Sequence, residues 1–258
     1  MSDDQKMEFD WLIVCALQIE TSAIASLLNN PKSITIGKSS VVIGQIKTAR
    51  IALVTTGPGR KRIRQVLPLL LDQIHVSHLL NVGLCGGLSS ELSAGALIVP
   101  NDIIEEQGPS IQLASPVKDI QESFATVSLL SVIHPLHSRV LKEKAFTDSS
   151  AQAVDMEAFF VAEIAQDRKI PLTVIKGVSD DSLTDFPAEL MHVTRQDGGV
   201  DWSQLVRSIL FRPGMIIKLL RLQKSSRLAM KNVSEQVKRL IERCQSNGRT
   251  EGTADEHR

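Results

Sequence analysis

Three short, mainly apolar runs place the strongest constraint on the fold of this chain. They are Trp11–Leu17, His78–Val82 and Leu172–Val178. Runs of this length are typical of strands buried on both faces, as in parallel sheets whose strands alternate with helices. Helical patterns follow at Glu20–Leu28 and Arg60–Ile74. This alternation predicts an α/β protein with a three-layer α/β/α architecture, in which helices cover both faces of a central mixed sheet.

The remaining pattern fits one domain over residues 10–244, since no linker divides two cores. Further predicted strands and a helix occupy Ser33–Gly37, Val41–Ile46, Ala49–Thr55, Leu97–Val99, Asp102–Glu105 and Asp155–Gln166. Residues 203–244 form a basic helical C-terminal extension, with one long helix expected over Gly214–Cys244. We expect residues 1–9 and 245–258, which are polar, to be disordered.

Charge is unevenly distributed although the formal net charge is zero. Between Arg207 and Arg243 there are ten Lys and Arg residues against two Glu. Two interpretations of this basic helical segment are open: a last helix packed on the domain, or a helix that contacts a membrane surface peripherally. Aromatic residues make up only 3% of the chain. That scarcity argues against a nucleic-acid partner that stacks bases.

The cysteines and the N-terminus bear on cellular location. Cys15, Cys85 and Cys244 show no metal-binding spacing, so we expect no metal site. The N-terminal residues are acidic and lack the layout of a signal peptide. No apolar run approaches the roughly 18 residues that crossing a bilayer requires. We therefore expect a cytoplasmic protein, with peripheral membrane contact through the basic helix as an alternative.

Two glycine-rich segments follow predicted strands. Gly57-Pro58-Gly59 precedes a helix that begins with Arg60, and Gly83-x-x-Gly86-Gly87 follows His78–Val82. Turns of this kind expose backbone N–H groups that can hold an anion. Gly57, Gly59 and Arg60 are therefore a candidate anion site, although simple tight turns explain the glycines equally well.

Three acidic residues follow apolar runs or begin helices in distant parts of the chain: Glu20, Glu157 and Asp180. Each alone could be a helix-end acid, which the helix dipole favours. In open α/β sheets, however, ligands bind beyond the carboxyl ends of the strands. The three carboxylates together predict one acid/base site there.

The motifs around these acids resemble the nucleoside phosphorylase and nucleosidase superfamily over residues 10–186. The segments that carry the resemblance are Ala16–Glu20, Asn81–Leu88, Asp155–Ala158 and Ser179-Asp180. The pattern is most similar to the methylthioadenosine/S-adenosylhomocysteine nucleosidase branch. The resemblance implies a phosphorylase/hydrolase-like fold and hydrolysis of the N-glycosidic bond of an adenosine-type purine nucleoside.

The resemblance also implies roles for individual residues. Asp180 would be the general acid at N7 of the purine, and Glu20 would orient and deprotonate the attacking water. Glu157 would bind the ribose hydroxyls. Further implied substrate contacts are Met156, Ser179, Cys85, Gly86 and Phe186. Water is the nucleophile, no cofactor is needed, and a homodimer or larger homo-oligomer is expected.

Leu84 departs from the family pattern, because the nucleosidases usually carry a small hydroxyl residue there. Three alternatives stay open beside the hydrolase. One is a phosphorylase that uses inorganic phosphate as co-substrate at Gly57, Gly59 and Arg60. The second is a nucleosidase acting on adenosylhopane, a lipid-linked nucleoside, and the third is a non-catalytic nucleoside-binding protein.

Overall fold

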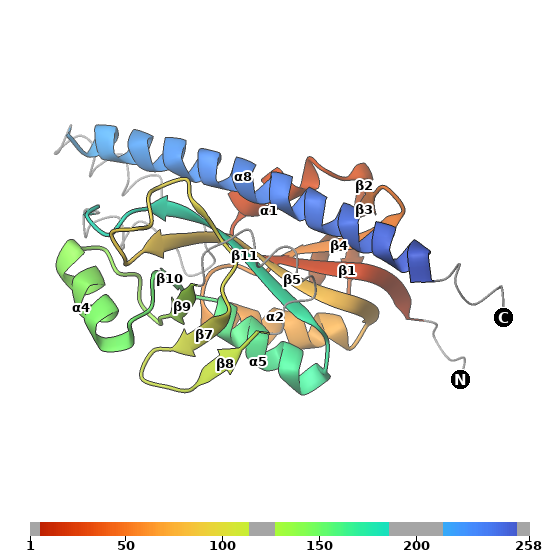
Figure 1. Ribbon diagram of the computed structural model, residues 1–258. Helices are drawn as coiled ribbons and strands as arrows, with labels where there is room; N and C mark the ends of the chain where they lie inside the picture. Colours follow the sequence, from red (N-terminus) through yellow and green to blue (C-terminus); the bar gives the residue numbers. More distant parts are fainter. Residues whose placement is uncertain (1–5, 114–126, 186–213, 252–258) are drawn as a thin grey trace.

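The computed structural model describes residues 6–113, 127–185 and 214–251 (Figure 1). Within these ranges the chain forms a sheet of eleven strands. The strands are β1 (Met7–Cys15), β2 (Asn29–Ile36), β3 (Ser39–Ile46), β4 (Ala49–Thr55), β5 (Ile74–Gly87), β6 (Leu97–Ile98), β7 (Asp102–Glu105), β8 (Ser110–Gln112), β9 (Ser128–Ser131), β10 (Ala153–Asp155) and β11 (Leu172–Asp180). The helices are α1 (Gln18–Ala25), α2 (Arg60–Leu71), α4 (Arg139–Ser149), α5 (Ala158–Arg168) and α8 (Gly214–Glu251).

The sheet is mixed, as predicted. The strand β5 pairs in parallel with β1 on one side and with β11 on the other, and β1 also pairs in parallel with β4. An antiparallel ribbon of β2, β3 and β4 forms one edge. Toward the other edge the order is β10, β9, β7 and β8, and β10 runs antiparallel to the end of β5.

Helices cover both faces of the sheet, which confirms the three-layer architecture. Figure 1 shows α2 and α5 on one face and α1 and α8 on the other. Leu67 of α2 and Phe160 of α5 belong to one buried apolar cluster. Ile24 of α1 and Val233 of α8 belong to a second. The core is mainly aliphatic because the chain has few aromatic residues, and its buried aromatic side chains within the described ranges are Phe9, Phe159 and Phe160 in the first cluster and Trp11 in the second.

The long helix α8 packs along β11. Its buried apolar residues include Ala229, Met230, Val233 and Val237. A Cβ atom at Gly177 of β11 would lie 2.8 Å from the Ala229 Cβ, so this glycine permits the close approach. The contact confirms the interpretation of a last helix packed on the domain.

Other side chains of α8 face solvent, and contact of this helix with a membrane surface remains a prediction. Leu220 is 58% exposed and Leu228 is 50% exposed. Among the described residues, no helix combines the length and apolarity needed to span a bilayer.

Several boundaries differ from the sequence predictions. The strand β1 begins at Met7 and α8 extends to Glu251, so residues 7–9 and 245–251, for which we expected disorder, lie within the bounds of these elements. The segment Gly83–Gly87 belongs to β5 and is not a turn. The short strand β10 and the helix α4 were not predicted, and α5 begins at Ala158 and not at Asp155.

Candidate active site

Glu20 lies at the start of α1, just beyond the carboxyl end of β1. Its side chain is buried, with 3% exposure. One carboxylate oxygen accepts hydrogen bonds from the backbone N–H groups of Ala16 and Leu17, both at 2.9 Å, and the other accepts from Leu84 N–H at 2.8 Å. Burial raises the pKa of Glu20, while Lys176 and the three N–H donors partly offset the rise. A fixed carboxylate with a raised pKa is suited to act as a base near neutral pH.

Lys176 is a buried cation in the middle of β11. Its ammonium lies 2.9 Å from a carboxylate oxygen of Asp155, and both side chains are at most 2% exposed. Burial alone would lower the pKa of Lys176, but the nearby carboxylates of Asp155, Glu157 and Glu20 outweigh it and raise that pKa. Lys176 therefore stays charged and offsets part of the negative charge around it.

Asp155 has a structural task in addition to this ion pair. It accepts a hydrogen bond from the Ala158 N–H at 3.0 Å, which caps the start of α5. Its other oxygen accepts from the Ser131 hydroxyl at 2.6 Å. Because both oxygens are engaged by protein groups, Asp155 acts as a support for Lys176 and α5.

Glu157 turns its carboxylate toward the glycine-rich turn before α2. It accepts a hydrogen bond from Gly59 N–H at 2.7 Å. Burial, followed by the charge of Asp155, raises the pKa of Glu157 to about 7. Gly57 and Gly59 have φ angles of 84° and 83°, in the left-handed region that favours glycine. This turn presents a backbone N–H to Glu157 across 98 residues of sequence.

Two groups of the predicted anion site at Gly57, Gly59 and Arg60 have acidic partners within the protein, and the site stays a prediction. The Gly59 N–H is already used by Glu157. The guanidinium of Arg60 lies 3.5 Å from a carboxylate oxygen of Glu105 and 5.1 Å from the centre of the Phe160 ring. Both groups are thus engaged by other parts of the protein.

Asp180 ends β11 and is 8% exposed. One of its oxygens accepts from the Ser179 hydroxyl, which also lies 3.1 Å from the carbonyl oxygen of Cys85. The other oxygen accepts from the ammonium of Lys142, a residue of α4. Asp180 is thus a carboxylate with a hydroxyl on one side and a buried cation on the other.

The strand β5 brings Glu20 and Asp180 to one site. A Cβ atom at Gly83 would lie 2.7 Å from a Glu20 oxygen, and one at Gly86 would lie 3.3 Å from an Asp180 oxygen. Glycines are needed here because carboxylates pack directly on the strand backbone. At about 3.3 Å per residue, the two contact points are roughly 10 Å apart along β5. Cys85 lies between them in sequence, and burial, with smaller contributions from the charges of Asp155, Asp180 and Glu20, raises the pKa of its thiol.

The charges of the site do not balance. Its ionisable side chains comprise four carboxylates and two ammonium groups, namely Glu20, Asp155, Glu157, Asp180, Lys142 and Lys176. The surplus is negative whenever more than two of the acids are ionised. Such a site disfavours a bound phosphate dianion and favours a substrate that develops positive charge.

Neither Lys142 nor Lys176 was predicted from the sequence, and one predicted site residue lies outside the described residues. Lys176 interrupts the apolar strand Leu172–Val178, and a charge in a buried strand is a signal that could have been used. Lys142 gave no such signal, because it lies in a polar segment like a surface lysine. Phe186 lies outside the described residues. Met156 is near the site, since its terminal methyl lies 3.9 Å from a Cβ position at Gly59.

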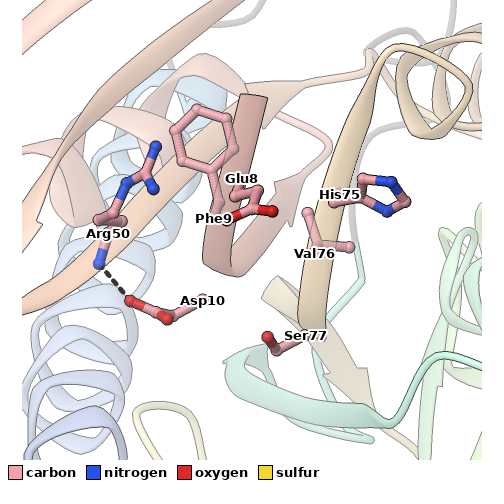
Figure 2. Close-up of a pocket in the computed structure, with 7 residues that line it drawn as sticks. All are labelled: Glu8, Phe9, Asp10, Arg50, His75, Val76 and Ser77. Carbon is pink, nitrogen blue, oxygen red and sulfur yellow. Dashed lines mark hydrogen bonds between the residues drawn. The ribbon is translucent and has the colours of Figure 1, made fainter. Parts of the chain in front are cut away.

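A separate cavity of about 380 Å³ lies at the opposite end of the parallel strands (Figure 2). Its lining comes from the amino ends of β1 and β5 and from β4: Glu8, Phe9, Asp10, Arg50, His75, Val76 and Ser77. The Asp10 carboxylate accepts a hydrogen bond from Arg50 N–H at 2.7 Å. None of the predicted site residues lines this cavity.

Comparison with known proteins gives consistent relatives. The sequence profile of the Phosphorylase superfamily matches residues 10–116. A 5′-methylthioadenosine/S-adenosylhomocysteine nucleosidase from Buchnera aphidicola is 26% identical over 212 residues, which cover 70% of this chain and 82% of the relative.

Solved structures with the same fold include two from Helicobacter pylori. One is a mutant of the methylthioadenosine nucleosidase, with 5′-methylthioadenosine in the active site. It has a TM-score of 0.70 at 16% identity, covering 92% of this chain and 100% of the other. The other is futalosine hydrolase, with a TM-score of 0.71 at 14% identity, covering 92% and 98%. At these identities the similarity establishes the fold.

Proposed function

We propose that this chain, whose residues 10–116 match the Phosphorylase superfamily, hydrolyses the N-glycosidic bond of a purine nucleoside. The observation that carries the proposal is a group of three buried carboxylates: Glu20 and Asp180 pack on β5, and Glu157 lies near enough to Glu20 for that charge to contribute to its raised pKa. The names of the relatives support an adenosine-type substrate such as 5′-methylthioadenosine or S-adenosylhomocysteine. The reaction releases the free base and a free sugar.

Glu20 activates the attacking water in this proposal. Three backbone N–H groups fix its carboxylate, and one of its oxygens carries a single hydrogen bond. Each carboxylate oxygen has two lone pairs, so a water can still donate to it. Water is a weak nucleophile and gains reactivity when a base at hydrogen-bond distance accepts its proton.

Glu157 binds the ribose hydroxyls and stabilises the transition state. Breaking the N-glycosidic bond gives the sugar oxocarbenium character, as in glycoside hydrolysis. A carboxylate held nearby in a water-poor site lowers the energy of that positive charge. Because the pKa of Glu157 is raised to about 7, its charged form gains population as the pH rises through neutrality.

Asp180 and Ser179 bind the purine. A purine leaves poorly as an anion, so its N7 must receive a proton or a strong hydrogen bond as the bond to the sugar breaks. The hydroxyl of Ser179 orients one oxygen of Asp180, which leaves this carboxylate in a defined direction toward the base.

Water is favoured over phosphate as the nucleophile. The Gly59 N–H donates to Glu157 and Arg60 pairs with Glu105, so both groups already have acidic partners. The negative surplus of the site further disfavours a phosphate dianion. The phosphorylase is therefore the runner-up.

Product analysis tests the proposal. The purified protein is incubated with methylthioadenosine, S-adenosylhomocysteine, adenosine, inosine and a lipid-linked adenosine, each with and without phosphate, and the products are separated by chromatography. We expect free base and free sugar at rates independent of phosphate. A sugar 1-phosphate formed only with phosphate would establish the phosphorylase. Tight nucleoside binding without turnover would establish a binding protein.

We also propose that the protein forms a homo-oligomer. Three apolar side chains near the end of β11 and around α4 are exposed to solvent: Ile133 at 52%, Val140 at 73% and Leu183 at 62%. Exposed apolar groups of this kind are common at subunit interfaces. Light scattering after size exclusion is expected to give at least a dimer, and a monomer at all concentrations would contradict this.

We also propose that the protein is cytoplasmic. Cys15, Cys85 and Cys244 are all free thiols. Free cysteines are typical of proteins kept in a reducing compartment. Flotation with anionic vesicles tests the alternative of peripheral contact through α8, and co-flotation at physiological salt would favour a membrane-associated enzyme.

A further inference from the structure

The helix α4 buries a lysine and exposes its apolar side chains. Lys142 is 1% exposed and is the one buried residue of this helix. Val140, Leu141 and Phe146 are 73%, 36% and 39% exposed. This reverses the usual pattern, because a lysine is almost never fully buried without a partner. The helix therefore delivers Lys142 to a specific place.

That place is the carboxylate of Asp180. The Lys142 ammonium donates to one Asp180 oxygen, to the Asp181 carbonyl oxygen at 2.6 Å and to the Thr184 carbonyl oxygen at 3.2 Å. An ammonium has three N–H donors and a neutral amine has only two. The three oxygen atoms match the three donors of an ammonium, and the amine is the stronger base of the pair, so the contact is an ion pair between a Lys142 ammonium and an Asp180 carboxylate.

An anionic Asp180 has no proton of its own to give to a departing base. Its two oxygens accept from Ser179 and from Lys142. A serine hydroxyl is too weak an acid to protonate a purine. Lys176, the other buried ammonium, pairs with Asp155. Lys142 is the ammonium in contact with the carboxylate that faces the base.

We propose that Lys142 supplies the proton of the leaving base through Asp180. The inference rests on the hydrolysis proposed above and concerns its base side only. As the bond between the sugar and the base breaks, its electron pair goes to the base. N7 takes a proton from Asp180, and Asp180 takes one from Lys142, which becomes a neutral amine.

The rest of the reaction balances this transfer. The water oxygen bonds to the anomeric carbon and its proton passes to Glu20. After the products leave, solvent carries a proton from Glu20 back to Lys142. Because Lys142 acts through Asp180, it is a positioning residue that also stores a proton, and Asp180 is the group that touches the base.

Two substitutions separate proton supply from charge alone. Lys142→Met removes the cation and the proton. Lys142→Arg keeps a cation but offers a much weaker acid, since a guanidinium does not give up its proton in proteins. If Lys142 only orients Asp180 by charge, arginine rescues activity. If Lys142 supplies the proton, both Lys142→Met and Lys142→Arg lose activity.

Each variant is assayed on a nucleoside and on 4-nitrophenyl ribofuranoside, whose leaving group departs without a proton. We expect kcat on the nucleoside to fall about 100-fold or more in both variants, the range of general acid catalysis. On the aryl riboside the loss should stay below about threefold. Equal losses on both substrates, or full rescue by arginine, would overturn the proposal.

The pH dependence of kcat is a second readout, usable even if the wild type rejects the aryl riboside. In Lys142→Met, Asp180 must carry the proton itself, so nucleoside hydrolysis recovers as the pH falls. A merely structural role lowers the rate equally at every pH, and a profile of unchanged shape would contradict proton supply. A wild type inactive on all nucleosides would instead refute the proposed function. All variants are assayed below the melting temperature of the least stable one, so that unfolding does not contribute to the loss of activity.

Discussion

The two ends of the parallel strands β1 and β5 both gather acids beside basic groups, yet they differ in almost every other respect. At the carboxyl end, Glu20 and Lys176 are buried. At the amino end, Glu8, Asp10 and His75 are exposed around an open cavity of about 380 Å³ (Figure 2). The open hollow therefore lies at the end that holds none of the predicted site residues.

Burial decides which end can do chemistry. Water screens the exposed groups of the amino end, so their interactions are weak. The groups of the carboxyl end are removed from water, and burial raises the pKa values of Glu20 and Glu157. Perturbed acids that are held by specific donors are the better indicator of a catalytic site.

The largest expected difference between the two ends is in kcat. Glu20→Gln removes the base that accepts the proton of water, and Asp180→Asn removes the carboxylate that serves the purine. We expect each to lower kcat about 1,000-fold, within the range for general acid–base catalysis. Chromatographic release of free base measures the effect. The matched control Glu8→Gln should keep kcat within a factor of two, and a comparable loss there would erase the distinction.

The second difference is in stability. Lys176→Met leaves Asp155, Glu157 and Glu20 without their buried cation, and breaking a buried ion pair in this way costs about 3–5 kcal/mol. Urea unfolding of the variant should show a loss of this size. Arg50→Met at the exposed amino end should change the free energy of unfolding by less than about 0.5 kcal/mol. A small effect at Lys176 would mean that the acids around it are mostly protonated.

The third difference concerns pH. The pKa of Glu157 is about 7 in the folded protein and 4.5 as a model value, so the folded state binds the proton more tightly. This contribution to stability is fully present below about pH 4.5 and is lost as the pH rises through 7. Glu157→Gln keeps the neutral form at all pH values. We expect the variant to gain stability over the wild type between pH 5 and 8, by on the order of 3 kcal/mol.

Thermal unfolding across this pH range checks the expectation. The gap between the melting temperatures of Glu157→Gln and the wild type should widen as the pH increases. A constant gap for Glu157→Gln would show that this carboxyl titrates normally.

The smallest effects are expected within the amino-end cavity. Asp10→Asn retains an oxygen that can accept the Arg50 N–H, and His75→Ala removes an exposed ring. Both should leave kcat and KM within a factor of two and stability within about 0.5 kcal/mol. A loss of activity in either variant would show that the cavity communicates with the opposite end of the sheet.

Much of the fold could be predicted because its signals are local. The buried strand at Leu172–Val178 and the helix from Arg60 follow from apolar runs and periodicity. The helix α4 could not be predicted this way, since it buries Lys142 in place of an apolar stripe. The glycines at Gly83 and Gly86 were assigned to a turn because glycine usually marks turns.

The residues of the candidate site could likewise be predicted only where the signal is local. Glu20 and Asp180 were predicted because they follow strands within motifs, and the structure brings both against β5. The role of Lys142 depends on a contact across 38 residues, and no local pattern records it. The glycines of β5 are explained only once the two carboxylates are seen to pack on its backbone.

The hydrogen bonds to Glu20 have a consequence for how a gene of this kind can change. All three come from main-chain N–H groups, at Ala16, Leu17 and Leu84. Every amino acid except proline supplies the same donor, whatever its side chain. Substitutions at these codons can therefore accumulate without loosening the carboxylate, and a hydroxyl residue can become Leu84. The position of the Glu20 carboxylate therefore depends on the path of the backbone and not on which side chains occupy these three positions.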